Sequence, residues 1–297
     1  MQYLINIIRG FCMALADSVP GVSGGTIAFV MGFYDEFINS LNNLIYGKWE
    51  EKKKAIFFLI KLGIGWIIGM IIAILILTSL FQDHVYAVSS VFMGLIIFAI
   101  PFIIKQEKNI LKGKYKNLIF TVIGIIIVCL ITYFNPVSGE NSGIDLSNLN
   151  IGLALYIFIA GMISISAMVL PGISGSTLLL IFGLYMPILT AIKEILNFNF
   201  DSLLVVIIFG LGIIAGVFCT IKLIKIALEK FRSQTIYCII GLMIGSIYAI
   251  IMGPTTLDVP QDQMTFGTFS IIFFIIGGVI IVGLEKLRNI LEKKERN

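Results

Sequence analysis

Long apolar runs with almost no charged residues recur along this chain and restrict it to few folds. They cover residues 56–80 (which contains Lys61), 86–104, 117–134, 151–170, 202–221, 235–252 and 266–284. Charged residues make up 13% of the sequence, whereas a soluble domain averages about 25%. Helices of about 20 residues cross about 30 Å of hydrocarbon, and the alternation typical of barrel strands is missing. We therefore predict an all-α polytopic membrane protein.

Basic residues predict how these spans are oriented, because lysine and arginine concentrate in cytoplasmic loops. They are frequent in loops 46–55, 105–116 and 222–233 and in the tail after residue 285. Loops 81–85, 135–150 and 253–265 contain none and are assigned to the outside. Lys193, in loop 193–201, disagrees with its outside assignment. Both termini are expected in the cytoplasm.

The same alternation predicts two inverted-topology repeats. Segment 1–45 must begin and end inside, whereas segment 151–196 must begin and end outside. Each is therefore a hairpin, and each is followed by three spans. The first repeat, 1–135, has hairpin 1–45 and spans 56–80, 86–104 and 117–134. The second repeat, 151–297, has hairpin 151–196 and spans 202–224, 235–252 and 266–284.

Each predicted hairpin contains one copy of a doubled motif. Residues 20–34 read PGVSGGTIAFVMGFY, and residues 171–185 read PGISGSTLLLIFGLY. Proline lacks a backbone donor and disfavours helix in the residue before it. We expect Pro20-Gly21 and Pro171-Gly172 to break the chain within the membrane. A new helix should then start near Ser23 and Ser174.

The restarted helices predict an anion site. A helix start presents backbone N–H groups and a positive dipole end, and glycine lets a ligand approach the backbone closely. Serine and threonine add hydroxyl donors, and the combination suits a phosphate. The alternative is a kink whose hydroxyls bond back to their own chain. The predicted phosphate-binding residues are Ser23, Gly24, Gly25, Thr26, Ser174, Gly175, Ser176 and Thr177.

Two charged residues precede the first motif. Asp17 lies in an apolar stretch, and its counterpart in the second repeat is Met168. A carboxylate at membrane depth is usually functional or paired, so Asp17 is a candidate for proton coupling or gating. It could instead cap a helix or pair with Arg9. On a straight helix, however, Arg9 is two turns away, about 12 Å of rise, which is too far for direct contact. Arg9 could attract a phosphate headgroup or extend toward the interface.

Other features predict packing or exclude chemistries. At an offset of 147 residues, Gly63, Gly65, Gly69 and Gly94 align with Gly210, Gly212, Gly216 and Gly241, and we interpret them as close helix contacts. The four cysteines form no metal-binding pattern, and the chain has one histidine, His84, expected in a surface loop. No nucleotide-binding motif is present. We expect no metal, no cofactor and no nucleic-acid partner.

The paired PGVSGGT and PGISGST motifs, each followed by Gly-x-Tyr, resemble those of the bacterial polyprenyl-phosphate transporter family, PopT. The resemblance covers essentially the whole chain. It implies a flippase of the bacterial cytoplasmic membrane that returns undecaprenyl phosphate from the outer to the inner leaflet. The lipid would be reused in peptidoglycan and other envelope polymers. The oligomeric state stays open.

Two other functions remain at this stage. Undecaprenyl-diphosphate phosphatases of the bacitracin-resistance type have a similar Pro-Gly-x-Ser motif, but an arginine follows that serine and a glutamate cluster lies on the other hairpin. Here Gly24 and Gly175 follow the serines, and residues 10–30 contain no glutamate. The motif offers no arginine to stabilise a transferring phosphoryl group and no paired acid and base, which disfavours hydrolysis. A transporter or channel for a small soluble anion is the other alternative.

Overall fold

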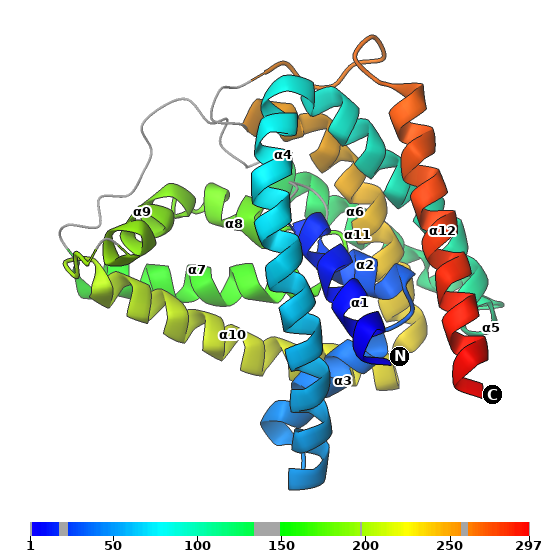
Figure 1. The fold of residues 1–297 in the computed structure, drawn as a ribbon, viewed down its shortest axis with the longest axis horizontal. Coiled ribbons are helices and arrows are strands. Elements are labelled where there is room, and N and C mark those ends of the chain that lie inside the picture. Colours follow the sequence, from blue (N-terminus) through cyan, green and yellow to red (C-terminus); the bar gives the residue numbers. More distant parts are fainter. Residues whose placement is uncertain (1, 18–22, 134–148, 197, 257–260, 297) are drawn as a thin grey trace.

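The protein is helical throughout the part that its computed structural model describes, residues 2–17, 23–133, 149–196, 198–256 and 261–296 (Figure 1). The prediction of an all-α fold is confirmed. The first half contains α1 (Gln2–Asp17), α2 (Gly24–Val30), α3 (Tyr34–Tyr46), α4 (Trp49–Gln106), α5 (Lys108–Leu111) and α6 (Leu118–Tyr133). The second half contains α7 (Ile151–Val169), α8 (Gly175–Ile181), α9 (Tyr185–Leu196), α10 (Leu203–Lys230), α11 (Arg232–Met252) and α12 (Ile271–Arg296).

Six segments of the described chain are long and apolar enough to cross a membrane. They are Trp49–Ala73, His84–Gln106, Tyr115–Tyr133, Ile151–Val169, Leu203–Lys230 and Arg232–Thr255. Five of them overlap predicted spans, and the sixth is the first arm of the second predicted hairpin. The opposite orientation of the two halves in a membrane stays a prediction.

Two predicted boundaries differ in detail from the helices of the structure. Helix α4 consists of two helices that meet at a kink at His84, where φ is −138° and ψ is 38°, so the chain turns within the predicted loop 81–85 without leaving helical structure for more than this residue. Residues 70–93 contain no glycine or proline that would end a helix. The predicted span 266–284 begins five residues late, at Ile271. Thr265 and Thr268 build a turn there, in which the Thr265 N–H donates to the Thr268 hydroxyl over 2.8 Å.

Six of the eight glycines predicted to make close helix contacts do so, whereas a Cβ on Gly63 or Gly210 would meet nothing within 4 Å. A Cβ on Gly65 of α4 would overlap the carbonyl oxygen of Ile7 in α1. A Cβ on Gly212 of α10 would overlap the carbonyl oxygen of Phe158 in α7. Phe158 corresponds to Ile7 at the motif offset of 151, so the same contact occurs twice. Helix α1 therefore packs on α4 as α7 packs on α10.

Two further helix pairs each consist of one helix from the first half and one from the second. Helix α6 of the first half packs on α11, and α12 of the second half packs on α4. Gly241 of α11 lies against the backbone of Thr121, and Gly94 of α4 lies against the backbone of Phe274. The two halves are thus joined through their later helices.

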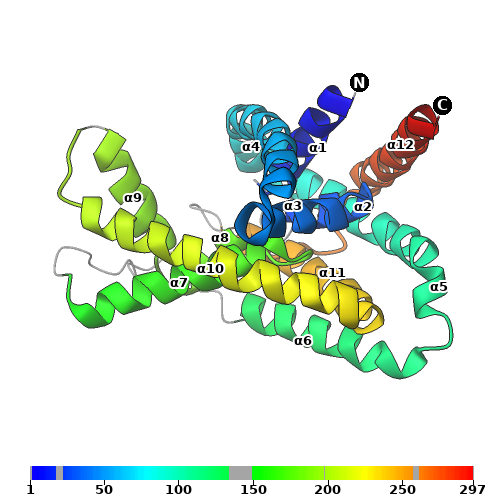
Figure 2. The ribbon, with the colours of Figure 1, turned by 90° about the horizontal axis from the view of Figure 1, so that it is seen from below.

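The largest buried apolar cluster lies where α1, α2, α3, α4 and α11 come together. A smaller cluster around Ile157, Leu184 and Phe209 holds α7, α8, α9 and α10 together. In Figure 2, helices α7, α9 and α10 extend to one side of the remaining helices. The two motif segments meet where this extension joins the rest of the molecule.

Candidate functional site

The first motif restarts a helix at the residue that the sequence predicts. Ser23 has an extended backbone and caps α2 by accepting a hydrogen bond from the Thr26 N–H over 3.3 Å. Helix α2 contains seven residues and is therefore about 10 Å long, which is too short to cross the hydrocarbon. The first hairpin thus contains a short helix that starts within the protein. Pro20 and Gly21 lie outside the described residues.

The second motif breaks the chain in the same way. Helix α7 ends at Val169, the turn contains Pro171 and Gly172, and α8 begins at Gly175. Gly172 has a φ of +88°, which favours glycine. A Cβ at Gly172 would also lie 2.6 Å from the backbone of Leu242 in α11. This break is therefore fixed by close packing as well as by proline.

The two motifs contact each other directly. The Ser23 hydroxyl donates to the Leu170 carbonyl over 3.0 Å. The Gly172 N–H donates to the Thr26 hydroxyl over 3.0 Å and to that of Ser23 over 3.3 Å. A Cβ on Gly25 would lie 2.8 Å from the Val169 carbonyl oxygen. The structure therefore brings together residues about 147 positions apart in the sequence.

The predicted hydroxyls face the protein interior. Ser23 and Thr26 are 1% and 3% exposed, and Ser174 and Thr177 are 7% and 9% exposed. A Cβ on Gly175 would lie 2.8 Å from the Ser164 carbonyl oxygen, so the helix start of α8 is closely packed too. The side chain of Ser176 lies outside the described part of the chain. Phosphate binding at these residues stays a prediction.

Asp17 caps the start of α2. Its Oδ1 accepts a hydrogen bond from the Gly24 N–H over 2.6 Å, and its Oδ2 accepts one from the Trp66 indole N–H over 2.9 Å. The carboxylate is therefore held by two donors, one on the restarted helix and one on α4. This geometry matches the helix-cap alternative, and it leaves the coupling role untested.

Two residues at this site were missed by the sequence analysis. Trp66 lies in the middle of an apolar run. Its indole N–H needs a hydrogen-bond partner there, and this requirement could have indicated a contact with a polar residue such as Asp17. The Tyr34 hydroxyl donates to the Val169 carbonyl over 3.2 Å and so adds a further bond between the two hairpins. Its signal was its place in the doubled motif.

Arg9 contacts the last residues of the first motif and α3, and not the hydroxyl-rich start of α2. Its guanidinium donates to Asn6 over 2.9 Å, pairs with Glu36 over 3.2 Å and lies 4.8 Å from the centre of the Phe33 ring. Within the described residues, no group of three histidine, cysteine, aspartate or glutamate side chains is placed to hold a metal ion.

Comparison with known proteins identifies the family. The model of a family described as undecaprenyl phosphate translocase-like (VCA0040-like) matches residues 13–268. A polyprenyl-phosphate transporter of Staphylococcus aureus is 34% identical over 287 residues, covering 95% of this chain and 96% of its own. A polyprenyl-phosphate transporter of Vibrio cholerae is 34% identical over 257 residues, covering 83% of this chain and 77% of its own. No solved structure gives a significant match. These descriptions are of transporters and not of enzymes, and the chain belongs to the undecaprenyl phosphate translocase-like family.

Proposed function

We propose that this multi-pass membrane protein is a flippase that moves undecaprenyl phosphate across the bacterial cytoplasmic membrane. Transport would run from the outer to the inner leaflet, returning the lipid for peptidoglycan and other envelope polymers. The family description and the names of both relatives support a polyprenyl-phosphate substrate. Both termini would lie in the cytoplasm, as the basic loops predict.

The direct contact between the two broken helices carries this proposal. Polar backbone and hydroxyl groups are costly in an apolar interior unless they are bonded. Here Ser23, Thr26 and Gly172 gather such groups between the two hairpins. A lipid phosphate needs a polar route for its headgroup only, because its isoprenoid tail can stay in the hydrocarbon. Donors between two broken helices suit such a headgroup.

The present hydrogen bonds suggest how binding would proceed. The hydroxyl of Ser23 and the N–H of Gly172 now bond to groups of the protein. A phosphate has acceptor oxygens that can replace Leu170 and Thr26 as their partners. We therefore expect the hairpins to separate slightly as the headgroup enters. If the two halves exchanged conformations around this point, the site would open alternately to each side of the membrane.

Asp17 is the proposed coupling residue. Its carboxylate bonds to the Gly24 N–H at the start of α2. A negative phosphate close to the same N–H would be repelled by an ionised Asp17. Protonation of Asp17 would remove that repulsion and so link proton binding to headgroup binding. No ATP-binding motif is visible in the sequence.

The test is translocation of a polyprenyl phosphate in proteoliposomes by the wild type and by a Ser23→Ala/Ser174→Ala variant. We expect the variant to transport at least tenfold more slowly, because it lacks one motif hydroxyl in each half. An unimpaired variant would remove the proposed site. Competition by excess inorganic phosphate tests the remaining alternative. If free phosphate is itself transported, the protein is a small-anion transporter.

Ser90→Ala is the matched control for this experiment. Ser90 is also fully buried, and its hydroxyl also joins two segments, because it donates to the Tyr86 carbonyl and accepts from the Ser270 N–H. It lies outside both motifs. Equal loss of transport in Ser90→Ala would show that the motif variant failed only through a weakened fold.

A further inference from the structure

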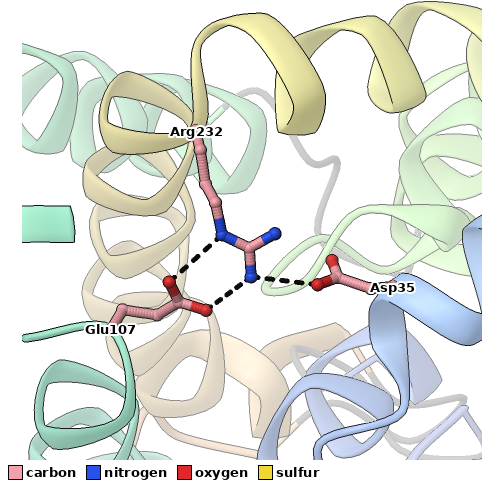
Figure 3. Close-up of polar contacts among 3 residues, drawn as sticks. All are labelled: Asp35, Glu107 and Arg232. Carbon is pink, nitrogen blue, oxygen red and sulfur yellow. Dashed lines mark hydrogen bonds and ion pairs between the residues drawn. The ribbon is translucent and has the colours of Figure 1, made fainter. Parts of the chain in front are cut away.

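Arg232, the first residue of α11, joins two carboxylates from other parts of the chain (Figure 3). Its Nη2 lies 2.7 Å from Oε1 of Glu107, and its Nε donates to Oε2 of the same residue over 3.2 Å. The same Nη2 lies 2.9 Å from Oδ2 of Asp35, at the start of α3. The residue therefore links α11 both to the end of α4 and to α3.

The two ion pairs differ in how easily they can part. The Glu107 side chain is 6% exposed and is held by two parallel bonds, an arrangement that is costly to break. The Asp35 side chain is 47% exposed and makes a single contact with Arg232. Exposed single ion pairs contribute little stability because water replaces them readily. The Asp35 contact is therefore the releasable one.

Helix α3 lies across α10 and is attached at both of its ends. Beyond the Asp35 contact, the Tyr46 hydroxyl at its far end donates to the Phe218 carbonyl of α10 over 3.2 Å. Lys222 of α10 lies 5.6 Å from the centre of the Tyr46 ring. Both attachments are to surface groups. Between these ends, Ile38 of α3 and Leu228 of α10 belong to the largest buried apolar cluster, so a movement of α3 away from α10 also has to separate this apolar contact.

A cavity of ≈ 320 Å³ lies between these attachments. Besides Asp35 and Arg232, it is lined by Ile38 and Asn39 of α3 and by Lys225, Leu228 and Glu229 of α10. Two cations and two carboxylates line it, so its charges cancel and do not favour an anion while α3 is in place. The cavity therefore separates α3 from α10, and its size depends on where α3 lies.

The ionic contact occurs in one half only. At the offsets of 151 and 147 residues, the counterparts of Asp35 and Arg232 are Met186 and Val85, which carry no charge. The predicted basic segment 222–233 is largely the last part of α10, which contains Lys222, Lys225 and Lys230, and Glu107 lies within the basic segment 105–116. The contact therefore belongs to the face that carries the basic loops.

We propose that α3 is a gate on this face and that the Asp35–Arg232 contact is its latch. Opening the latch would move α3 away from α10 and widen the cavity, which already opens partly at the surface beside Asp35, so that solution reaches its buried wall at Leu228. The gate's role in releasing the headgroup to the inner leaflet rests on the proposed function, whereas its movement does not. The Glu107–Arg232 pair stays intact and keeps the guanidinium in position for closure.

Cysteine accessibility tests the latch. Leu228 is 6% exposed and faces the cavity, so Leu228→Cys is the reporter, in a background with the four native cysteines changed to alanine. A membrane-impermeant maleimide is applied to the basic-loop face of oriented vesicles. We expect Asp35→Asn to raise the labelling rate several-fold. An unchanged rate would overturn the proposal.

Glu229→Gln is the matched control for charge. It removes a carboxylate from the same cavity, but its 3.8 Å ion pair is with Lys225 on the same helix and joins no second helix. We expect no increase in labelling. An equal increase in Glu229→Gln and Asp35→Asn would overturn the latch, because the cavity's charge would then control access.

Two further variants separate a gate from a structural support. Asp35→Glu keeps the carboxylate and should label close to the unmodified reporter. Ile236→Cys, a fully buried position in α11, reports unfolding. If Asp35→Asn raises labelling at both positions, the contact holds the fold together and the proposal fails. Increased labelling only at the cavity, in a protein that moves no lipid phosphate, would support the gate and reject the proposed function.

Discussion

The two hairpins share their packing but differ in their polar groups. Helix α1 meets α4 through the same glycine positions as α7 meets α10. Yet in the first half Asp17 bonds to Trp66 of α4, whereas the corresponding positions in the second half are Met168 and, in α10, Ile213. In the second half, Met168 lies beside Gly175 as Asp17 lies beside Gly24. Shared residues thus build the scaffold, and unshared ones distinguish the two sides.

The largest expected effect tests the shared packing. Gly65→Ala should prevent stable folding, because its Cβ would overlap the backbone of α1, and overpacking commonly costs about 1–3 kcal/mol or more. Gly63→Ala is the control, since a Cβ there meets nothing within 4 Å. Folded yield and thermal stability in detergent measure both variants.

The second half should repeat this result if the packing is shared. Gly212→Ala should behave as Gly65→Ala does, and Gly210→Ala should be tolerated because its Cβ also meets nothing within 4 Å. A stable Gly212→Ala protein would mean that the two contacts are not equivalent in strength.

The next largest effect is expected at Asp17, whose carboxylate has no counterpart in the second hairpin. Asp17→Asn keeps an oxygen that can accept from the Gly24 N–H, but it removes the charge. We expect a transport rate at least tenfold lower and independent of pH, with a moderate loss of thermal stability because the amide has no second oxygen to accept from the Trp66 N–H. Transport across a pH series in proteoliposomes measures this. Unchanged transport with an unchanged pH dependence would exclude proton coupling through Asp17.

Met168→Leu is the matched change in the other hairpin. A swap of methionine for leucine conserves volume and usually costs less than about 1.5 kcal/mol. It should leave both the transport rate and its pH dependence close to those of the wild type. A pH shift of similar size in this variant would mean that the asymmetry between the hairpins does not set coupling.

The smallest effect tests the partner of Asp17. Trp66→Phe removes the indole donor to Oδ2, and a hydrogen bond to a charged group contributes about 1.5–3 kcal/mol. We expect this loss of unfolding free energy and an altered pH dependence of transport. Ile213→Val, at the corresponding position, should lower stability by about 0.5–1.5 kcal/mol and leave the pH dependence unchanged. Identical pH profiles in the two variants would contradict an orienting role for Trp66.

The sequence could predict features that depend on local chemistry or on repetition. The helix starts at Ser23 and near Ser174 follow from proline and capping, and the contacts of Gly65 and Gly212 follow from their matching positions. These patterns need no knowledge of how distant segments are placed. The all-α class follows in the same way from the apolar runs.

Other features depend on the relative placement of distant segments. The bonds that join Ser23 and Thr26 to residues 170 and 172 could not be predicted from either motif alone, since Ser23 and Thr26 were expected to bind a ligand and Gly172 only to break the helix. Nothing near Asp35 in the sequence points to Arg232 as its partner, because the pairing needs α3 to lie beside α11. The chain turns at His84 within the predicted loop, but no glycine or proline nearby indicates that the turn is a helix kink.

The mutual bonding of the two motifs has a consequence for leakage. Without substrate, the described donors of Ser23 and Gly172 are already bonded to acceptors of the protein. Under the proposed function, an anion enters only if its bonds to these groups are better than those the protein makes with itself. A weakly accepting anion such as chloride would then be rejected, and the resting membrane would stay sealed.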